Sequence, residues 1–250
     1  MTTSIRPLYR YMLLILSGAC ICWMLWHIDR PNSLHPAEID QLLMQATFAQ
    51  DLKSLTVLKR AAEAGQVEAQ LALAKIYVFK QQSQQAILWL MQAEEQGNHE
   101  AATVLGKLYF QGDAKTPQNY RAAKHWFEQA QLQHDPVAAY YLGLIYKNGY
   151  GTKIQHKQAV HYFQLAAQDQ IPSAMYMLAN AYQFGDGVNV DLRQALFWYK
   201  AAADLELPEA IQELAQIYRY GNAEIQADTI AYQKHVLEIG HSLKHPALVP

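Results

Sequence analysis

Apolar residues recur along this chain in a pattern that repeats about every 36 residues. Leu142 and Leu178 stand 36 positions apart, and so do Tyr146 and Tyr182. A period in this range is typical of an array of structural repeats. The pattern contains five copies of a Leu followed four residues later by a Tyr: Leu73 and Tyr77, Leu105 and Tyr109, Leu142 and Tyr146, Leu178 and Tyr182, Leu214 and Tyr218.

The spacing within each copy predicts two α-helices. Ala174, Leu178 and Tyr182 are four residues apart and so share one face of a helix. In the second half of the copy, Ala195 and Trp198 share a face in the same way. We therefore expect a helical hairpin, with Leu, Tyr and Trp side chains filling the seam between its two helices.

Turn and cap residues separate the two predicted helices. Gly149-Tyr-Gly151 and Gly185-Asp-Gly187 supply residues that tolerate a positive φ, which a chain reversal after a helix requires. Asp191, Asn119 and Asp228 precede second helices and can accept hydrogen bonds from their first N–H groups. A hairpin of this kind needs a neighbouring hairpin to cover its apolar face.

The unit from Ala174 to Ala203 resembles the Sel-one-like repeat, a relative of the tetratricopeptide repeat. It has the pattern A-x-x-x-L-A-x-x-Y-x-x-G-x-G-V-x-x-D-x-x-x-A-x-x-W-x-x-x-A-A. Other units depart from it: the earlier one with Gly112-Asp-Ala114 lacks the second glycine. The resemblance covers roughly Leu52 to Leu243. It implies an all-α, right-handed superhelical solenoid of antiparallel helix hairpins, which serves as a binding scaffold.

The chain divides into five predicted parts along its length. The division is a basic segment 1–10, a transmembrane segment 11–28, a linker 29–36, the repeat solenoid 37–243 and a tail 244–250. Within the solenoid we expect a degenerate cap at 37–65 and repeats at about 69–97, 101–134, 138–170, 174–206 and 210–243.

The stretch from Tyr11 to Ile28 contains 18 residues without a formal charge. As a helix it would extend about 27 Å, close to the ~30 Å hydrocarbon core of a bilayer. Arg6 and Arg10 precede it, and basic residues favour the cytoplasmic side. We expect a single-pass anchor in a bacterial inner membrane, with the repeat domain in the periplasm.

Two alternatives to an uncleaved anchor stay open. Ser17-Gly-Ala19 resembles a signal-peptide cleavage site, although cleavage there would leave an apolar N-terminus. Ser17-Gly-Ala-Cys20 partly resembles a lipobox, in which case Cys20 would carry a lipid. Both cysteines, Cys20 and Cys22, lie in this segment, so the repeats have no disulfide.

Composition argues against several functions. The net charge is −2 and 17% of the residues are charged, without a run of Lys or Arg. A nucleic-acid partner would need a basic surface, so we expect none. The sequence lacks the common hydrolase, zinc-protease and nucleotide-binding motifs. We predict no catalytic residues, no metal, no cofactor and no enzyme activity.

The predicted binding site is a groove lined by the first helix of each hairpin. With the repeat alanine as position zero, positions +2, +6 and +9 form a face separate from the core. In the later repeats they are Thr103, Lys107, Phe110, Tyr140, Leu144, Lys147, Tyr176, Asn180, Gln183, Gln212, Gln216 and Arg219. Tyr and Arg are common binding anchors, although Tyr140 and Tyr176 could instead pack between hairpins.

These features predict a membrane-anchored scaffold that binds another protein of the bacterial cell envelope. Two alternatives stay open, and the resemblance supports the first of them. One is a periplasmic immunity protein that neutralises a secreted toxin, such as a type VI phospholipase. The other is an assembly factor for exopolysaccharide or secretion machinery.

Overall fold

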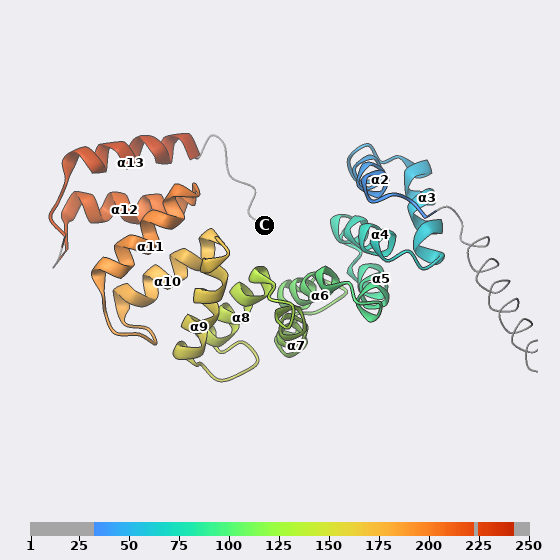
Figure 1. Cartoon of the computed structure of the whole chain (residues 1–250), viewed down its shortest axis with the longest axis horizontal. Helices are drawn as coiled ribbons and strands as arrows, with labels where there is room; N and C mark the ends of the chain where they lie inside the picture. The colour runs from blue at the N-terminus through green and yellow to red at the C-terminus, as the bar shows by residue number, and fades with distance from the viewer. Residues whose placement is uncertain (1–32, 223–224, 243–250) are drawn as a thin grey trace, which may run out of the picture. The chain divides into compact units, whose positions relative to one another are not determined.

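The computed structural model describes residues 33–222 and 225–242, and every regular element among them is an α-helix (Figure 1). The helices are α2 (Pro36–Phe48), α3 (Leu52–Glu63), α4 (Val67–Phe79), α5 (Ser83–Glu95), α6 (His99–Gln111), α7 (Tyr120–Gln131), α8 (Pro136–Asn148), α9 (His156–Gln168), α10 (Pro172–Phe184), α11 (Leu192–Asp204), α12 (Pro208–Tyr220) and α13 (Thr229–Ser242).

Consecutive helices pair as hairpins, and successive hairpins pack against each other within each unit. The pairs are α2 with α3, α4 with α5, α6 with α7, α8 with α9, α10 with α11, and α12 with α13. This arrangement confirms the predicted all-α helical repeat solenoid. The right-handed superhelical path of the whole array stays a prediction.

The chain divides into two compact units between Gln96 and Gly97. The first unit contains α2 to α5 and buries a core around Leu58, Leu73 and Ile76. The second unit contains α6 to α13, and its core follows the repeat period, with Leu142 and Leu178 fully buried.

An aromatic ring seated against a small residue closes two of the hairpins of the second unit. Phe127 and Phe163 are almost fully buried, and their rings lie against Gly106 and Gly143. A Cβ at Gly106 would lie 2.5 Å from Phe127 Cε1, so only glycine permits this approach. The rings that fill the seam therefore stand one residue after those we predicted, because Trp126 and Trp198 are only partly buried.

The predicted turn and cap residues occupy the positions expected of them. Gly149 and Gly185 adopt the left-handed conformation directly after α8 and α10. Asp191, Asn119 and Asp228 each accept backbone hydrogen bonds at the start of α11, α7 and α13. Capping of this kind satisfies N–H groups that have no partner within the helix.

The predicted N-terminal basic segment, the transmembrane segment 11–28, Cys20 and the tail 244–250 lie outside the described residues. Within 33–222 and 225–242, no helix has both the length and the apolar character to cross a bilayer. The anchor and the lipidated cysteine therefore stay predictions.

Candidate protein-binding face

The first helices of the second unit, α6, α8, α10 and α12, share an open side. We call this side the first-helix face. On each helix it consists of the residue directly before the repeat alanine and of the residues three, six and ten positions after that alanine. The last residue of each of the four helices is exposed on this face: Gln111, Asn148, Phe184 and Tyr220. Phe184 and Tyr220 are 65% and 67% exposed, although both are aromatic.

The predicted residues of α6 are partly built into the fold. Thr103 is only 6% exposed, and its hydroxyl donates to Asp135 Oδ2 over 2.7 Å. Lys107 is half-buried with its Nζ 5.8 Å from the centre of the Tyr141 ring. Burial lowers the pKa of Lys107, and Asp135 opposes that shift. Thr103 and Lys107 thus connect α6 with α8.

Phe110, at the end of α6, belongs to an aromatic cluster. Its ring meets those of Tyr120, Tyr141 and Tyr150 edge to face, with centroids 5.4, 5.2 and 5.8 Å away. Tyr120 and Tyr150 stack on each other at 4.5 Å. Edge-to-face and offset-stacked pairs are the favoured arrangements of aromatic side chains. The cluster joins the connections that follow α6 and α8.

The predicted residues of α8 line the contact with α10. Tyr140 and Leu144 are partly buried and pack against the core around Leu178. Burial raises the pKa of Tyr140, and Ser173 of α10 hydrogen-bonds to its hydroxyl. Lys147 Nζ lies 3.6 Å from Met177 Sδ. Tyr140 therefore has the inter-hairpin packing role that the sequence left open.

The predicted residues of α10 hold a tyrosine of the next helix. Tyr199 is fully buried, and its hydroxyl lies 2.8 Å from Asn180 Oδ1 and 2.6 Å from Gln183 Oε1. The ring of Tyr176 packs against that of Tyr199 at 5.7 Å between centroids. Burial raises the pKa of Tyr199 well above its ordinary value, and Glu213 adds to the shift. Asn180 and Gln183 thus connect the hairpin core with its surface.

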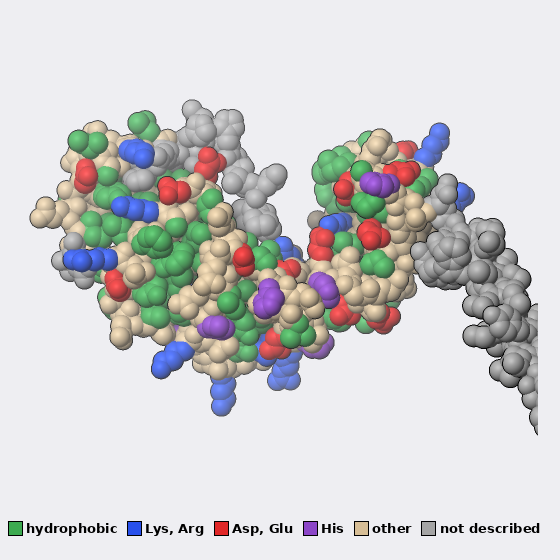
Figure 2. Space-filling view, in the orientation of Figure 1, with side chains coloured by type: hydrophobic (Ala, Val, Ile, Leu, Met, Phe, Trp, Pro, Cys, Tyr) green, Lys and Arg blue, Asp and Glu red, His purple; other side chains and the backbone are tan. Residues whose placement is uncertain are grey.

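The predicted residues of α12 are the most open of the set. Gln212, Gln216 and Arg219 are all exposed. The Arg219 guanidinium lies 5.0 Å from the centre of the Tyr220 ring and 5.5 Å from that of Tyr232. Figure 2 shows hydrophobic side chains gathered over α10, α11 and α12, with single charged side chains between them.

Position +10 is the part of the open side that sequence reasoning missed. The +2 residues Leu71 and Thr103 are buried, whereas Phe79 is exposed at the +10 position of α4. In α6 and α8 the following first helix packs against the +2 residue, Thr103 or Tyr140, so the open side is rotated by about one residue from the predicted one. The sequence contains a signal for this position, because the aromatic residues Phe79, Phe184 and Tyr220 all stand at position +10 of their repeats.

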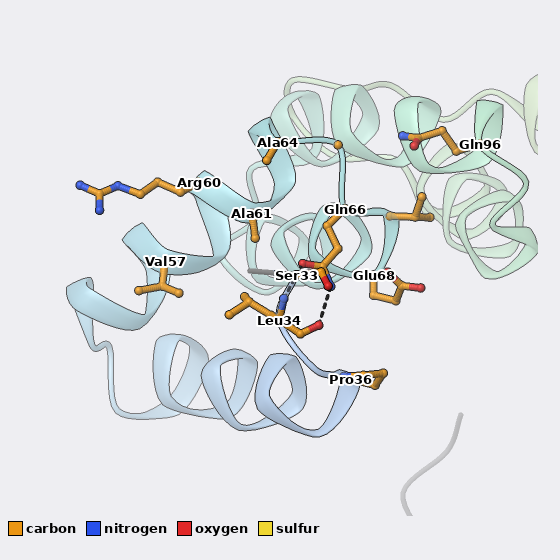
Figure 3. Close-up of a pocket in the computed structure, with 12 residues that line it drawn as sticks. Ser33, Leu34, Pro36, Val57, Arg60, Ala61, Ala64, Gln66, Glu68 and Gln96 are labelled. Atoms are coloured by element: carbon orange, nitrogen blue, oxygen red, sulfur yellow. Dashed lines mark hydrogen bonds between the residues drawn. The ribbon is translucent and has the colours of Figure 1, made fainter. Parts of the chain in front are cut away.

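A pocket of about 680 Å³ opens in the first unit, between the start of α2, the face of α3 and the start of α4 (Figure 3). At its floor the Gln66 side-chain amide makes two hydrogen bonds with the backbone of Leu34, one from the Leu34 N–H at 3.0 Å and one to its carbonyl at 2.6 Å. This pair attaches the segment before α2 to the connection before α4. Among the described residues, no group of three potential metal ligands is present.

A family model described as the Sel1 repeat matches residues 99–133, 136–170 and 172–207. These ranges are the hairpins α6–α7, α8–α9 and α10–α11. The chain is 32% identical over 102 residues to an ERAD-associated E3 ubiquitin-protein ligase component from Arabidopsis thaliana. That alignment covers 39% of this chain and only 16% of the plant protein.

Solved structures share the fold. A Sel1 repeat protein from Oxalobacter formigenes is 27% identical, with a TM-score of 0.73 over 87% of this chain and 93% of that one. A protective antigen of uropathogenic Escherichia coli with an SLR fold is 23% identical, with a TM-score of 0.68 over 85% and 49%. An immunity protein from Pseudomonas aeruginosa is 17% identical, with a TM-score of 0.58 over 88% and 86%.

The repeat period, the helical hairpins and the matched family model agree in register. Each matched range begins at or next to the first residue of a first helix, and the hairpin that follows is complete within it. The chain is a Sel1-like repeat helical protein.

Proposed function

We propose that this protein is a non-enzymatic scaffold that binds another protein through the first-helix face of its second unit. The supporting observation is the face itself. Four helices present exposed aromatic, amide and charged side chains, and two of the exposed aromatics, Phe184 and Tyr220, lie outside the two core clusters around Leu178 and Tyr199. Exposed apolar side chains within a polar surround are typical of interaction surfaces.

The side chains of this face suit a protein partner better than a small molecule. Asn148, Phe184, Gln216 and Tyr220 come from three different helices and form an extended row rather than one enclosed site. Small-molecule sites are concave and bury most of the ligand, whereas an extended row matches a segment of another chain. Glu209 at one end of α12 and Arg219 at the other supply charges of both signs.

We also propose that the domain acts in the bacterial cell envelope. The 18-residue apolar segment from Tyr11 to Ile28, preceded by Arg6 and Arg10, supports a single-pass inner-membrane anchor with the repeats in the periplasm. A lipid on Cys20 would place the repeats next to a membrane as well. The partner would then be another envelope protein.

Site-specific photo-crosslinking in the native cell tests the binding face. A photoreactive amino acid at Asn148, Phe184 or Tyr220 should yield one discrete adduct with the partner. His161 and Phe197, exposed on the second helices α9 and α11, are the matched control positions. Adducts from the control positions alone would contradict the proposal, as would no adduct from any position.

A secreted toxin is the first alternative partner, and a component of an assembly complex is the second. The immunity protein from Pseudomonas aeruginosa shares the fold at 17% identity, a likeness of fold alone. The crosslinked partner distinguishes the three roles. A secreted toxin such as a phospholipase would favour immunity, and a component of exopolysaccharide or secretion machinery would favour an assembly factor.

A further inference from the structure

The connections between the two helices of each hairpin stack on one another along one edge of the second unit. A Cβ at Gly151 would lie 3.1 Å from the backbone nitrogen of Arg121, at the start of α7. A Cβ at Gly187 would lie 2.5 Å from the backbone carbonyl of His156, at the start of α9. Each connection thus rests on the preceding hairpin. We call this strip, residues 112–121, 149–157 and 185–193, the loop edge.

The loop edge has more basic than acidic residues, chiefly through the connection 149–157, and the opposite edge of the same hairpins is acidic. On the loop edge the charged residues are Lys115, Arg121, Lys153, Lys157 and Arg193 against Asp113, Asp186 and Asp191. On the opposite edge, where each second helix ends and the next first helix begins, residues 128–138, 165–174 and 201–210 contain Asp or Glu but neither Lys nor Arg. Figure 2 shows Lys and Arg side chains projecting below α7, α8 and α9.

Apolar side chains stand among these basic residues at equivalent places in two loops. Ile154 is 58% exposed and Val190 is 60% exposed, each five residues after the glycine that ends its first helix. A Cβ at Gly149 would lie 2.8 Å from Ile154 Cγ1, and one at Gly185 would lie 3.0 Å from Val190 Cγ2. Both side chains are therefore seated on a turn of fixed conformation.

Lysines adjoin both apolar side chains. Lys153 directly precedes Ile154, and both residues are exposed. Lys157 lines the same open pocket as Val190, together with Gly187, Asn189 and Asp191. Both exposed aliphatic side chains of the loop edge thus have an exposed lysine nearby, although Val190 also has the carboxylate of Asp191 beside it.

We propose that the loop edge docks on an anionic phospholipid surface. Lysines near an anionic leaflet are attracted by its surface potential, and single aliphatic side chains beside them can enter the interfacial region. Isolated aliphatic side chains at the tips of stacked loops can all contact a flat membrane surface. Binding to a protein partner would instead require a pocket that receives an anchoring side chain.

Hydrogen–deuterium exchange on the full chain tests this docking. The protein is reconstituted in nanodiscs of phosphatidylcholine alone or of phosphatidylcholine and phosphatidylglycerol in equal parts. Amides of 150–155 and 186–191 should exchange more slowly in the anionic discs, and high salt should remove the difference because it screens the attraction. Equal exchange in the two lipids would overturn the proposal.

A triple variant and a matched control assign the effect to the loop edge. Lys153→Glu, Ile154→Ser and Lys157→Glu together should abolish the protection, because each lysine contributes about fivefold to surface binding. Lys59→Glu, Leu132→Ser and Lys200→Glu make the same chemical changes at exposed positions elsewhere and should leave it intact. Equal loss in both variants would overturn the proposal. Should the first variant unfold, Val190→Ser alone must still reduce the protection of 186–191.

Discussion

Gly106 and Phe127 lie in direct contact across the α6–α7 hairpin, with the buried ring occupying the space where a Cβ would be. In the α4–α5 hairpin the same two places hold Ala74 and Leu90, both fully buried. In the α10–α11 hairpin they hold Ala179 and Tyr199, so the repeat accepts a glycine with a phenylalanine and an alanine with a leucine or a tyrosine. At Gly106 and Gly143 the phenylalanine ring leaves no room for a Cβ.

Gly106→Ala should destabilise the second unit. Alanine favours a helix over glycine by about 1 kcal/mol, but overpacking a core typically costs about 1–3 kcal/mol, so we expect a net loss. Adding Phe127→Leu recreates the pair found at Ala74 and Leu90 and should recover part of the free energy of unfolding. Chemical denaturation of the two variants measures this. A double variant no more stable than Gly106→Ala would contradict the account of paired positions.

Leu178→Asp should be far more damaging. Leu178 is fully buried in the core cluster of the α8 to α11 hairpins, and an aspartate there would have no partner for its charge. We expect a loss of several kcal/mol in the free energy of unfolding. Gln216→Asp, at an exposed position, is the control and should change thermal melting little. Unchanged melting of the Leu178 variant would mean that the repeat register is wrong.

Tyr199→Phe should alter the pH dependence of stability. Burial raises the pKa of Tyr199 above that of the unfolded chain, so the stability it contributes is present below pH ~10 and is lost as the pH rises beyond that. At neutral pH the variant should be less stable by about 1 kcal/mol, because the hydrogen bonds with Asn180 and Gln183 are gone.

Urea unfolding at neutral pH and near pH 11 checks this prediction. Burial also raises the pKa of Tyr140, Tyr141 and Tyr162, so both proteins lose stability in alkali. The wild type should lose more of its free energy of unfolding than the Tyr199→Phe variant. The difference in stability between the two proteins should therefore be smaller near pH 11 than at neutral pH. A constant gap would show that the Tyr199 hydroxyl does not titrate with folding.

The sequence was sufficient to predict the hairpins, their period and their caps. Leu142, Gly149 and Asp191 each act through local rules of burial, positive φ and capping, and local rules can be read from spacing. The binding side was harder to predict because it depends on which flank of a helix its neighbour covers. Thr103 appeared open from its spacing, yet Asp135 of the following repeat binds its hydroxyl and α8 covers it.

The aromatic seam could not be predicted for a similar reason. Trp126 and Phe127 are adjacent, and both are apolar. The Phe127 ring enters the seam against Gly106 of the facing helix, whereas Trp126 stays partly exposed. This is a pairwise constraint between helices, which the periodicity of one helix does not contain.

The topology proposed for the N-terminal segment can be tested directly. A reporter that is active only outside the cytoplasm, fused after Pro250, should be active, with the fusion protein in the membrane fraction. Recovery in the soluble fraction would exclude the anchor. Incorporation of labelled palmitate that is lost in Cys20→Ala would instead favour a lipoprotein over a transmembrane helix.

The central claim is that the first-helix face binds the partner. Asn148→Glu, Phe184→Ser and Tyr220→Ser together change three exposed residues of that face. His161→Glu, Phe197→Ser and Leu132→Ser are the matched control, exposed on or beside the second helices. Both variants should keep the helical content and melting temperature of the wild type.

Titration calorimetry of the crosslinked partner against the two variants and the wild type is the most direct test. Loss of anchoring aromatic side chains commonly weakens binding by about tenfold or more, and we expect at least that loss for the face variant. The control variant should bind like the wild type. Wild-type affinity of the face variant, with weakened binding of the control, would contradict the claim.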